Sequence, residues 1–506
     1  MAEYLLGLDE GTTGCKACVF DLDGNVIASD YREYPCYYPQ KGWVEQIPED
    51  ITPALYASVK AAVEASGVDP ADIKAMGISS QGSVIGLLDE DGKLIRPFVG
   101  WQDLRGEETL AQLGEKLDKD TYYKITGNPL GSTWSYSKLE WLRENEPENW
   151  AKTALFSTNQ DYFLRAFGAE DYWTDLSSAS REGTLITDTF DWDPVTHDIL
   201  GIPIEKRAKI ALEPGKVVGH ITAEVAAQTG LAEGTALCVA AHDQNCSTFG
   251  GGAVNPGETV MVIGTFGSCF VVLGEPNRDP AGKLVVKPNH GVGNWTIEAF
   301  SLTSASAFRW YRDTLADMER SVAAESGRDP YDVITESVAQ VPPGANGVTF
   351  LPYLQGAAGS RQNGKAQATF IGMSLGTTKA DMARAVLEGI CFEMREIVEA
   401  QKQAGIEVTS IRLTGGAAKS PLWCQMLADI FQCPIDLLQT SETGCLGAAL
   451  YSGIGIGLYP DAQAAVKRAV KVTKRYEPKP ENAAAYDAAF ARFVAVYEAL
   501  EPTIFV

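Results

Sequence analysis

The stretch Asp9-Glu-Gly-Thr-Thr-Gly14 joins two apolar runs near the start of the chain. Glycines let a backbone approach an anion closely and turn its N–H groups toward it, and each threonine adds a hydroxyl donor. A carboxylate just before such a turn is compatible with a phosphate only when Mg²⁺ or water lies between them. The residue types therefore predict half of a nucleotide triphosphate site, with Asp9 beside the metal.

The same pattern recurs half a chain later, where Gly264-Thr-Phe-Gly-Ser268 again separates two apolar runs. Two unrelated β-hairpins are one explanation, because turns that contain glycine are common between strands. The matched Gly-Thr-x-Gly core at the start of each half favours a duplicated architecture instead. We expect the two turns to form the two jaws of one phosphate clamp.

Two further glycine-rich segments are interpreted differently. A strand-like run, Ile411–Thr414, leads into Gly415-Gly416, which could admit the flat face of an adenine. An ordinary strand-to-helix turn with Ser420 as the N-cap is equally compatible with this segment. The segment Gly359–Lys365 has the spacing of a P-loop, but an alanine follows it where Mg²⁺ binding needs serine or threonine, so we expect a surface loop.

A base for proton abstraction is suggested by the apolar run Ala236–Ala241, which ends in His242-Asp-Gln-Asn245. α/β folds place their chemistry at the carboxyl ends of strands that face a crevice, so Asp243 is the predicted base. Helix capping by Asp243 is about as typical of this local sequence. His242 is interpreted as a structural histidine and is left out of the predicted site.

The elements around these motifs alternate between helix and strand. Helical periodicity is clear in 53–65, 109–117, 138–144, 380–400 and 483–500, and buried strands fit 73–79, 236–241, 347–352 and 411–413. Such alternation predicts two α/β domains. The glycine-rich run 250–256 is typical of a loop or hinge, so we place the domains at residues 1–250 and 251–506.

Composition limits the class of partner. The 506 residues are 45% hydrophobic and 21% charged, with a formal net charge of -24, which argues against nucleic acid or an anionic membrane surface. The first apolar run carries Asp9 and Glu10, so no signal peptide is expected, and no window is long enough to span a bilayer. Ten scattered cysteines, with Cys15 and Cys18 as strand residues, fit a reducing cytoplasm.

Taken in order along the chain, the motifs resemble those of the FGGY carbohydrate kinases. The matching residues are Asp9-Glu-Gly-Thr-Thr, Gly42-Trp-Val-Glu45, Trp101-Gln-Asp-Leu-Arg105, Lys138-Leu-Glu-Trp-Leu142, Asp243-Gln244, Gly264-Thr265, Phe370-Ile-Gly372 with Arg384-Ala-Val-Leu-Glu-Gly389, Gly415-Gly416, and Leu446-Gly-Ala-Ala449. The resemblance implies two duplicated actin/hexokinase-like (ribonuclease H-like) ATPase domains with a cleft between them. The N-terminal domain would bind the sugar and the C-terminal domain ATP.

The resemblance also implies roles for individual residues. Asp243 matches the catalytic base, and Asp9 the aspartate near Mg²⁺ and the γ-phosphate. The residues predicted to bind ATP are Thr12, Thr13, Gly14, Lys16, Gly264, Thr265, Gly415, Gly416 and Ser420. Those predicted to bind the substrate are Gln81, Gly82, Ser83, Trp101, Asp103 and Gln244, although Trp101 has core packing as an alternative role.

The identity of the substrate depends on the two residues after Gln81. Glycerol kinases carry an Arg-Glu pair at these positions and xylulokinases Met-His, whereas this chain has Gly82 and Ser83. We interpret this as a pocket with fewer fixed charges and more room than a glycerol site. It favours a ketose, with a pentulose such as xylulose as the central candidate and glycerol or another polyol as the alternative.

Other functions are compatible with the same fold. An actin- or heat-shock-type ATPase switch would hydrolyse ATP whatever sugar is present and would have a polypeptide partner. The predicted sugar-domain residues count against it. A catalytically silent sugar sensor is disfavoured because Asp9, Asp243 and both phosphate turns are intact. The expected partner is a small sugar or polyol, with neither nucleic acid nor membrane, and a homodimer is left open.

Overall fold

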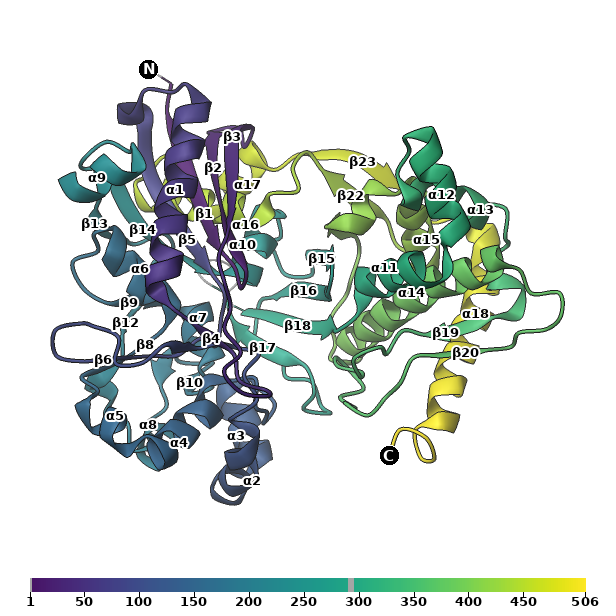
Figure 1. Ribbon diagram of the computed structural model, residues 1–506, viewed down its shortest axis with the longest axis horizontal. Helices are drawn as coiled ribbons and strands as arrows, with labels where there is room; N and C mark the ends of the chain where they lie inside the picture. Colours follow the sequence, from purple (N-terminus) through teal and green to yellow (C-terminus); the bar gives the residue numbers. More distant parts are fainter. Residues whose placement is uncertain (1, 290–294) are drawn as a thin grey trace.

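The computed structural model describes residues 2–289 and 295–506 of the chain. Figure 1 shows two lobes side by side, the first built mainly from the N-terminal half and the second from the C-terminal half. Each lobe is organised around one large β-sheet flanked by helices. No helix in these ranges is long and apolar enough to cross a membrane. The α/β architecture expected from the alternating pattern is confirmed.

The first sheet has the strand order β13–β14–β5–β1–β2–β3. Strands β1, β5 and β14 run parallel to one another, whereas β2 and β13 pair antiparallel to their neighbours. Because parallel strands end at the same edge, the residues after β1, β5 and β14 lie together. The bounds are β1 Tyr4–Glu10, β2 Gly14–Asp21, β3 Val26–Glu33, β5 Ile73–Ser80, β13 Val217–His220 and β14 Ala236–His242.

The second sheet repeats this arrangement in the order β17–β18–β16–β15–β21–β22–β23. Strands β15, β21 and β22 are parallel, and β16 and β23 are antiparallel to their neighbours. The strand β15 therefore corresponds to β1, and the duplication inferred from the two turns is present in the strand topology. The bounds are β15 Thr259–Ile263, β16 Gly267–Leu273, β17 Val285–Pro288, β18 Trp295–Ser301, β21 Ile411–Thr414, β22 Ile435–Leu438 and β23 Val472–Tyr476.

Helix α1 (Pro48–Ser66) covers one face of the first sheet. Pro48 stands in its first turn with two acidic residues, Glu49 and Asp50, and Gly67 ends it in the left-handed conformation. Its apolar side chains pack into the same core as the strand residues of β1, β2 and β5. Helices α6 (Asn159–Phe167) and α9 (Ala223–Thr229) contribute to this layer.

The opposite face of the first sheet is covered by helices from both halves of the chain. Helix α10 (Asp243–Gly250) packs against α16 (Thr443–Gly455), which lies directly on β1 and β5. A Cβ atom added to Gly7 would lie 1.8 Å from the carbonyl oxygen of Cys445, so only glycine permits this approach. Helix α17 (Ala462–Ala469) belongs to the same core. The C-terminal half therefore contributes helices to the first lobe.

In the second lobe, the long helix α14 (Lys379–Gln403) lies at the centre of the core. A reciprocal capping box between Thr378 and Asp381 begins it. Helix α15 (Pro421–Phe431) begins as predicted, with Ser420 as its N-cap and Pro421 in its first turn. The other helices are α11 Ser304–Leu315, α12 Asp317–Ser326, α13 Pro330–Val338 and α18 Pro480–Leu500, and the short strands are β19 Thr349–Leu351 and β20 Thr369–Ile371.

A smaller group of helices and short strands extends from the first lobe below the sheet (Figure 1). It comprises β4 Glu45–Gln46, β6 Gly86–Leu88, β7 Phe98–Val99, α2 Glu107–Lys116, α3 Lys119–Thr126, α4 Ser135–Asn145, α5 Pro147–Lys152, β8 Leu155–Ser157, β9 Trp173–Asp175, α7 Leu176–Arg181, β10 Leu185–Ile186, β11 Asp191–Trp192, α8 Pro194–Leu200 and β12 Lys209–Ala211. Each predicted helix and strand coincides with an observed one. The segment 359–366 contains no helix or strand, in agreement with the rejection of a P-loop.

Candidate active site

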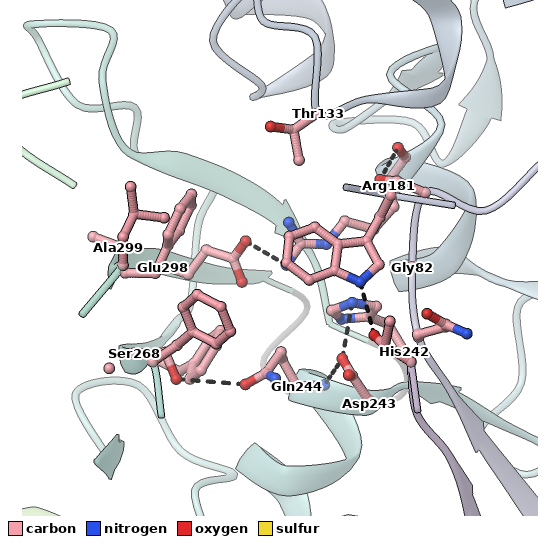
Figure 2. Close-up of a pocket in the computed structure, with 18 residues that line it drawn as sticks. Gly82, Thr133, Arg181, His242, Asp243, Gln244, Ser268, Glu298 and Ala299 are labelled. Atoms are coloured by element: carbon pink, nitrogen blue, oxygen red, sulfur yellow. Dashed lines mark hydrogen bonds and ion pairs between the residues drawn. The ribbon is translucent and has the colours of Figure 1, made fainter. Parts of the chain in front are cut away.

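A cavity of about 300 Å³ lies where residues of the two halves meet (Figure 2). The first half contributes the carboxyl ends of β5 and β14, and the second half contributes the β15–β16 turn and β18. Predicted site residues on its wall are Thr12, Gln81, Gly82, Ser83, Trp101, Asp243 and Gln244. Further lining residues include Thr133, Arg181, His242, Phe266, Gly267, Ser268, Phe270 and Glu298.

The predicted base, Asp243, lies at the start of α10 with its side chain 27% exposed. Its Oδ1 accepts hydrogen bonds from the backbone N–H of Gln244 at 2.6 Å and lies 2.9 Å from Nε2 of His242. Burial alone would raise the pKa of Asp243, but His242 and Arg181 outweigh it and hold the pKa below its usual value. Asp243 is therefore ionised at neutral pH, as a general base must be.

His242, which the sequence suggested to be merely structural, lies on the cavity wall against Asp243 (Figure 2). Burial lowers the pKa of its imidazole, against the opposing effect of Asp243, so the ring is neutral at pH 7. The backbone N–H of His242 donates to Oγ of Ser177 at 3.0 Å. Its position next to Asp243 in the sequence was the signal that this residue belongs to the site.

Asp9 is the second-last residue of strand β1 and accepts a hydrogen bond from the Ser79 hydroxyl at 2.7 Å. Burial raises the pKa of Asp9 to about 7, and the negative charge of Asp243 adds to the increase. A cation beside Asp9 would reverse this effect. No group of three or more His, Cys, Asp or Glu side chains in the described ranges is arranged to hold a metal. One carboxylate suffices for Mg²⁺ when phosphate oxygens and water complete the shell, so Asp9 fits that ion.

The first Gly-Thr turn is fixed by residues that reach into the cavity. The Trp101 indole N–H donates to Oγ1 of Thr12 at 2.9 Å, and the Gln46 amide donates to the Thr12 carbonyl at 2.8 Å. The Gln81 amide donates to Oε1 of the buried Glu10 at 2.8 Å and to Oε1 of Gln46 at 3.0 Å. The turn and the wall of the cavity therefore form one hydrogen-bonded unit.

The second Gly-Thr turn is held by the start of helix α11. The backbone N–H of Ala305 donates to the Gly264 carbonyl at 2.8 Å, and the Ser306 hydroxyl donates to the Thr265 carbonyl at 2.9 Å. Phe266 at the tip of the turn contacts Trp101 of the first half edge to face, with 6.4 Å between the ring centroids. Thr12 of the first turn and Phe266 of the second therefore lie on the wall of the same cavity, and the phosphate clamp stays a prediction.

The third glycine segment lies behind the second turn. Gly415 has a φ of +86°, and a Cβ atom there would lie 2.5 Å from the Ile263 carbonyl oxygen, so glycine is required. Gly416 is exposed at the end of β21. The Ser420 hydroxyl accepts from the backbone N–H of Trp423 at 3.4 Å and caps α15. None of Gly415, Gly416 and Ser420 lines the cavity.

Besides Asp9, Gly264, Thr265 and the third glycine segment, four more predicted residues lie off the cavity wall. Lys16 pairs with Glu442 at 2.8 Å, Thr13 is exposed, and Gly14 is buried in β2. Asp103 is 1% exposed, and its oxygens accept from the Arg105 side chain at 2.8 Å and from the Val44 N–H at 2.6 Å. The structure therefore does not bring Asp103 to the substrate cavity, because its hydrogen-bonding capacity is used inside the first lobe.

Gly82 and Ser83 do not themselves open space into the cavity, and the expectation of few fixed charges does not hold for its wall, which carries Arg181 and Glu298. A Cβ atom on Gly82 would lie 2.6 Å from Cδ2 of His242 and 2.9 Å from Cγ of Arg181, so these two side chains fill the space. The Ser83 hydroxyl donates to the Arg181 carbonyl at 2.9 Å and not into the cavity. The charges that are absent at positions 82 and 83 are supplied by other elements.

A buried ion cluster that sequence reasoning missed forms part of the wall. Arg181, at the end of α7, lies 2.5 Å from one carboxylate oxygen of Glu298, and Lys287 lies 2.6 Å from the other (Figure 2 shows the Arg181–Glu298 pair). Glu298 and Lys287 come from β18 and β17 of the second half. A charged residue inside each of these otherwise apolar strands was the signal in the sequence.

Similar proteins are known for nearly the whole chain. The gluconokinase of Bacillus subtilis is 30% identical over 510 residues, which cover 99% of this chain and 97% of that protein. The xylulose kinase of the same organism is 28% identical over 497 residues, covering 98% and 97%. A solved gluconate kinase structure from Lactobacillus acidophilus matches with a TM-score of 0.91 at 26% identity, covering 100% of this chain and 99% of that one.

The family models divide the chain as the two sheets do. The model for the N-terminal domain of the FGGY family of carbohydrate kinases matches residues 4–250, and the model for the C-terminal domain matches residues 259–456. Carbohydrate kinases use ATP as the phosphate donor, and the paired Gly-Thr turns on either side of a cavity suit that chemistry. The chain therefore belongs to the FGGY family of carbohydrate kinases, and it is a sugar kinase.

Proposed function

We propose that this kinase transfers the γ-phosphoryl group of ATP to a primary hydroxyl of an open-chain sugar, with a pentulose such as xylulose as the first candidate. The observation that carries the proposal is the position of Asp243, whose Oδ1 is held by two donors while its side chain stays 27% exposed at the cavity. Residues 1–250 would bind the sugar and residues 251–506 would bind ATP.

In the proposed reaction the sugar hydroxyl donates its proton to Asp243 as its oxygen attacks the γ-phosphorus. The new O–P bond forms in line with the breaking bond to the β-phosphate oxygen, and ADP leaves. Because the transition state needs little covalent help from the protein, positioning and charge stabilisation supply most of the rate. Asp9 would hold Mg²⁺, which neutralises the charge that develops on the phosphate oxygens.

The two turns would cradle the phosphates from opposite sides. Thr12 and Thr265 offer hydroxyls, and the glycines allow backbone N–H groups to approach. Trp101 and Phe266 contact each other between the halves, which restricts the access of water to the reacting phosphate. Exclusion of water matters because it otherwise competes with the sugar hydroxyl as the acceptor.

The size and polarity of the cavity support a five- or six-carbon substrate. About 300 Å³ is more than a three-carbon triol needs, and amide groups of Gln81 and Gln244 offer partners for hydroxyls. A second candidate is a sugar acid, because the guanidinium of Arg181 on the wall suits a carboxylate. The similarity to a gluconokinase and to a gluconate kinase over nearly their whole lengths also supports this second candidate. Glycerol remains the third candidate.

The cellular setting is also a proposal. All ten cysteines are free, which supports a reducing compartment such as the cytoplasm. The strongly acidic surface supports a small-molecule partner over nucleic acid or membrane. A homodimer is compatible with these features and has no support beyond them.

The test is the rate of ADP release from ATP and Mg²⁺ in the presence of xylulose, ribulose, gluconate, ribitol and glycerol in turn. We expect xylulose to raise the rate most. A larger rise with gluconate would favour the sugar-acid candidate, with Arg181 as the partner of its carboxylate. The variant Arg181→Met should then abolish the rise in rate that gluconate causes. If no sugar raised the basal rate, an ATPase switch of the actin type would replace the proposal.

The assignment of the base has a separate test. Asp243→Asn keeps the size of the side chain but removes the proton acceptor, so kcat is expected to fall at least about 100-fold while ATP still binds. Isothermal titration with a non-hydrolysable ATP analogue measures that binding. A variant that turned over near the wild-type rate would show that another group accepts the proton.

A further inference from the structure

We propose that His242 is the positioning residue for the catalytic carboxylate, and that Gly82 is glycine because it must make room for His242. The proposal rests on the function proposed above, since it assumes that Asp243 accepts the proton of the sugar. It assigns roles to His242 and Gly82, neither of which belongs to the two phosphate turns.

The geometry of Asp243 separates its two oxygens. Oδ1 is held by the Gln244 N–H at 2.6 Å and by the His242 ring at 2.9 Å. No donor to Oδ2 is found among residues 2–289 and 295–506. Because a carboxylate anchored through one oxygen presents the other in a fixed direction, His242 determines where the accepting oxygen lies.

The hydrogen bond also defines the tautomer of the ring. A carboxylate oxygen only accepts, so Nε2 of His242 carries the hydrogen and donates it to Oδ1. Nδ1 is buried and has no hydrogen-bond partner in the described part of the chain. The polar function of the side chain is therefore directed at Asp243, as Figure 2 shows.

The backbone of His242 is anchored on one side, and its ring lies against Gly82 on the other. On one side, the Ser177 hydroxyl accepts from the His242 backbone N–H at 3.0 Å, and Ser177 is fixed by its own N–H donating to Asp175 at 2.7 Å. On the other side lies Gly82, where a Cβ atom would approach Cδ2 of His242 to 2.6 Å. A side chain at position 82 would therefore displace the ring from Asp243.

The proposal explains why the pocket has glycine at position 82. The space is used by the His242 ring and by the Cγ of Arg181, which also approaches the missing Cβ, at 2.9 Å. Arg181 in turn is bound to Glu298 of the second half. Gly82 is thus the point around which the positioning residue and the charged wall pack together.

The experiment compares His242→Leu with His242→Gln, using the sugar that gives the highest rate in the panel. Leucine fills the space but cannot donate, so kcat is expected to fall roughly 10- to 100-fold with little change in the KM of ATP or sugar. Glutamine places an amide N–H near the position of Nε2 and is expected to recover most of the loss. Melting temperatures establish that each variant is folded.

Gly82→Ala tests the second part of the proposal through a double-mutant cycle. In the wild type, the added methyl group is expected to lower kcat about 10-fold by displacing the ring. In the His242→Leu background, the same change should alter kcat less than about twofold, because the contact with Asp243 is already absent. Gly86→Ala is the matched control. Gly86 lies in strand β6, away from the cavity, and a Cβ atom there would lie 2.6 Å from the ring of Phe98.

The outcomes separate the two proposals. If His242→Leu keeps kcat within twofold of the wild type, or if His242→Gln is as slow as His242→Leu, the positioning role is wrong. Full additivity of Gly82→Ala and His242→Leu would overturn the role of Gly82. If Asp243→Asn is itself active, the proposed base fails first. If no sugar raises the rate of ADP release, the proposed function fails, and the positioning role of His242 fails with it.

Discussion

The two Gly-Thr turns share one backbone plan and differ in chemistry. In each, a parallel strand at the centre of a sheet turns back through Gly-Thr into an antiparallel strand. Asp9 stands two residues before Gly11 in the first turn, and Val262 stands at the corresponding position before Gly264 in the second. Of the two corresponding strands, only β1 therefore carries a carboxylate next to its Gly-Thr turn.

The difference shows how the reaction divides between the halves. Both carboxylates assigned to chemistry, Asp9 and Asp243, come from the first half. The second half presents neutral donors at its turn, and its buried carboxylate Glu298 is paired with Arg181 and Lys287. In the proposed mechanism the first half would handle the proton and the metal, whereas the second half would hold phosphate through neutral groups.

The largest expected effect comes from removing the charge that distinguishes the turns. Asp9→Asn should lower kcat roughly 100- to 1,000-fold and raise the Mg²⁺ concentration needed for half-maximal rate, because a metal-binding carboxylate is lost. Thr265→Ala in the second turn removes one neutral hydroxyl, worth about 1 kcal/mol, and should raise the KM of ATP about fivefold. An equal loss of kcat/KM in the two variants would contradict the proposal that the two turns have different roles.

A second prediction concerns stability, because helix α16 from the C-terminal half packs on the first sheet. Gly7→Ala would place a Cβ atom 1.8 Å from the Cys445 carbonyl, where no side-chain rotation relieves the clash. The free energy of unfolding should fall by about 3 kcal/mol, as measured by urea denaturation. Gly364→Ala, at a position with nothing within 4 Å, is the control. A loss below about 1 kcal/mol would show that α16 can shift away from the sheet.

The sequence predicts features that consecutive residues form, and it does not predict clusters whose residues lie far apart along the chain. The turns, the strand that ends at Asp243 and the cap of α15 are each contained in a few consecutive residues, and all were predicted. The charged wall joins Arg181, Lys287 and Glu298 from three elements, so no spacing along the chain announces it. Asp103 shows the converse error, because its motif suggested substrate binding while Arg105 and Val44 use its oxygens.

The smallest expected effect concerns a carboxyl group of the second lobe that resembles Asp9 in its burial and its hydrogen bond. Glu393 of α14 accepts from the Ser301 hydroxyl at 2.7 Å, as Asp9 does from Ser79. Burial raises the pKa of Glu393 to about 8, against the lowering effect of Ser301. The folded protein therefore keeps a proton that the unfolded chain releases near pH 4.5, and its stability falls as pH rises from there to about 8.

Glu393→Gln is neutral at every pH and should escape that loss. Relative to the wild type, its melting temperature should rise by a few °C between pH 5 and pH 8.5, while kcat changes less than about twofold, in contrast to Asp9→Asn. Glu399→Gln, on the exposed side of the same helix with 39% of its side chain accessible, should follow the wild type at both pH values. A melting temperature of Glu393→Gln that ran parallel to the wild type would mean that Glu393 is ionised in the folded state. Its likeness to Asp9 would then be limited to the hydrogen bond from a serine hydroxyl.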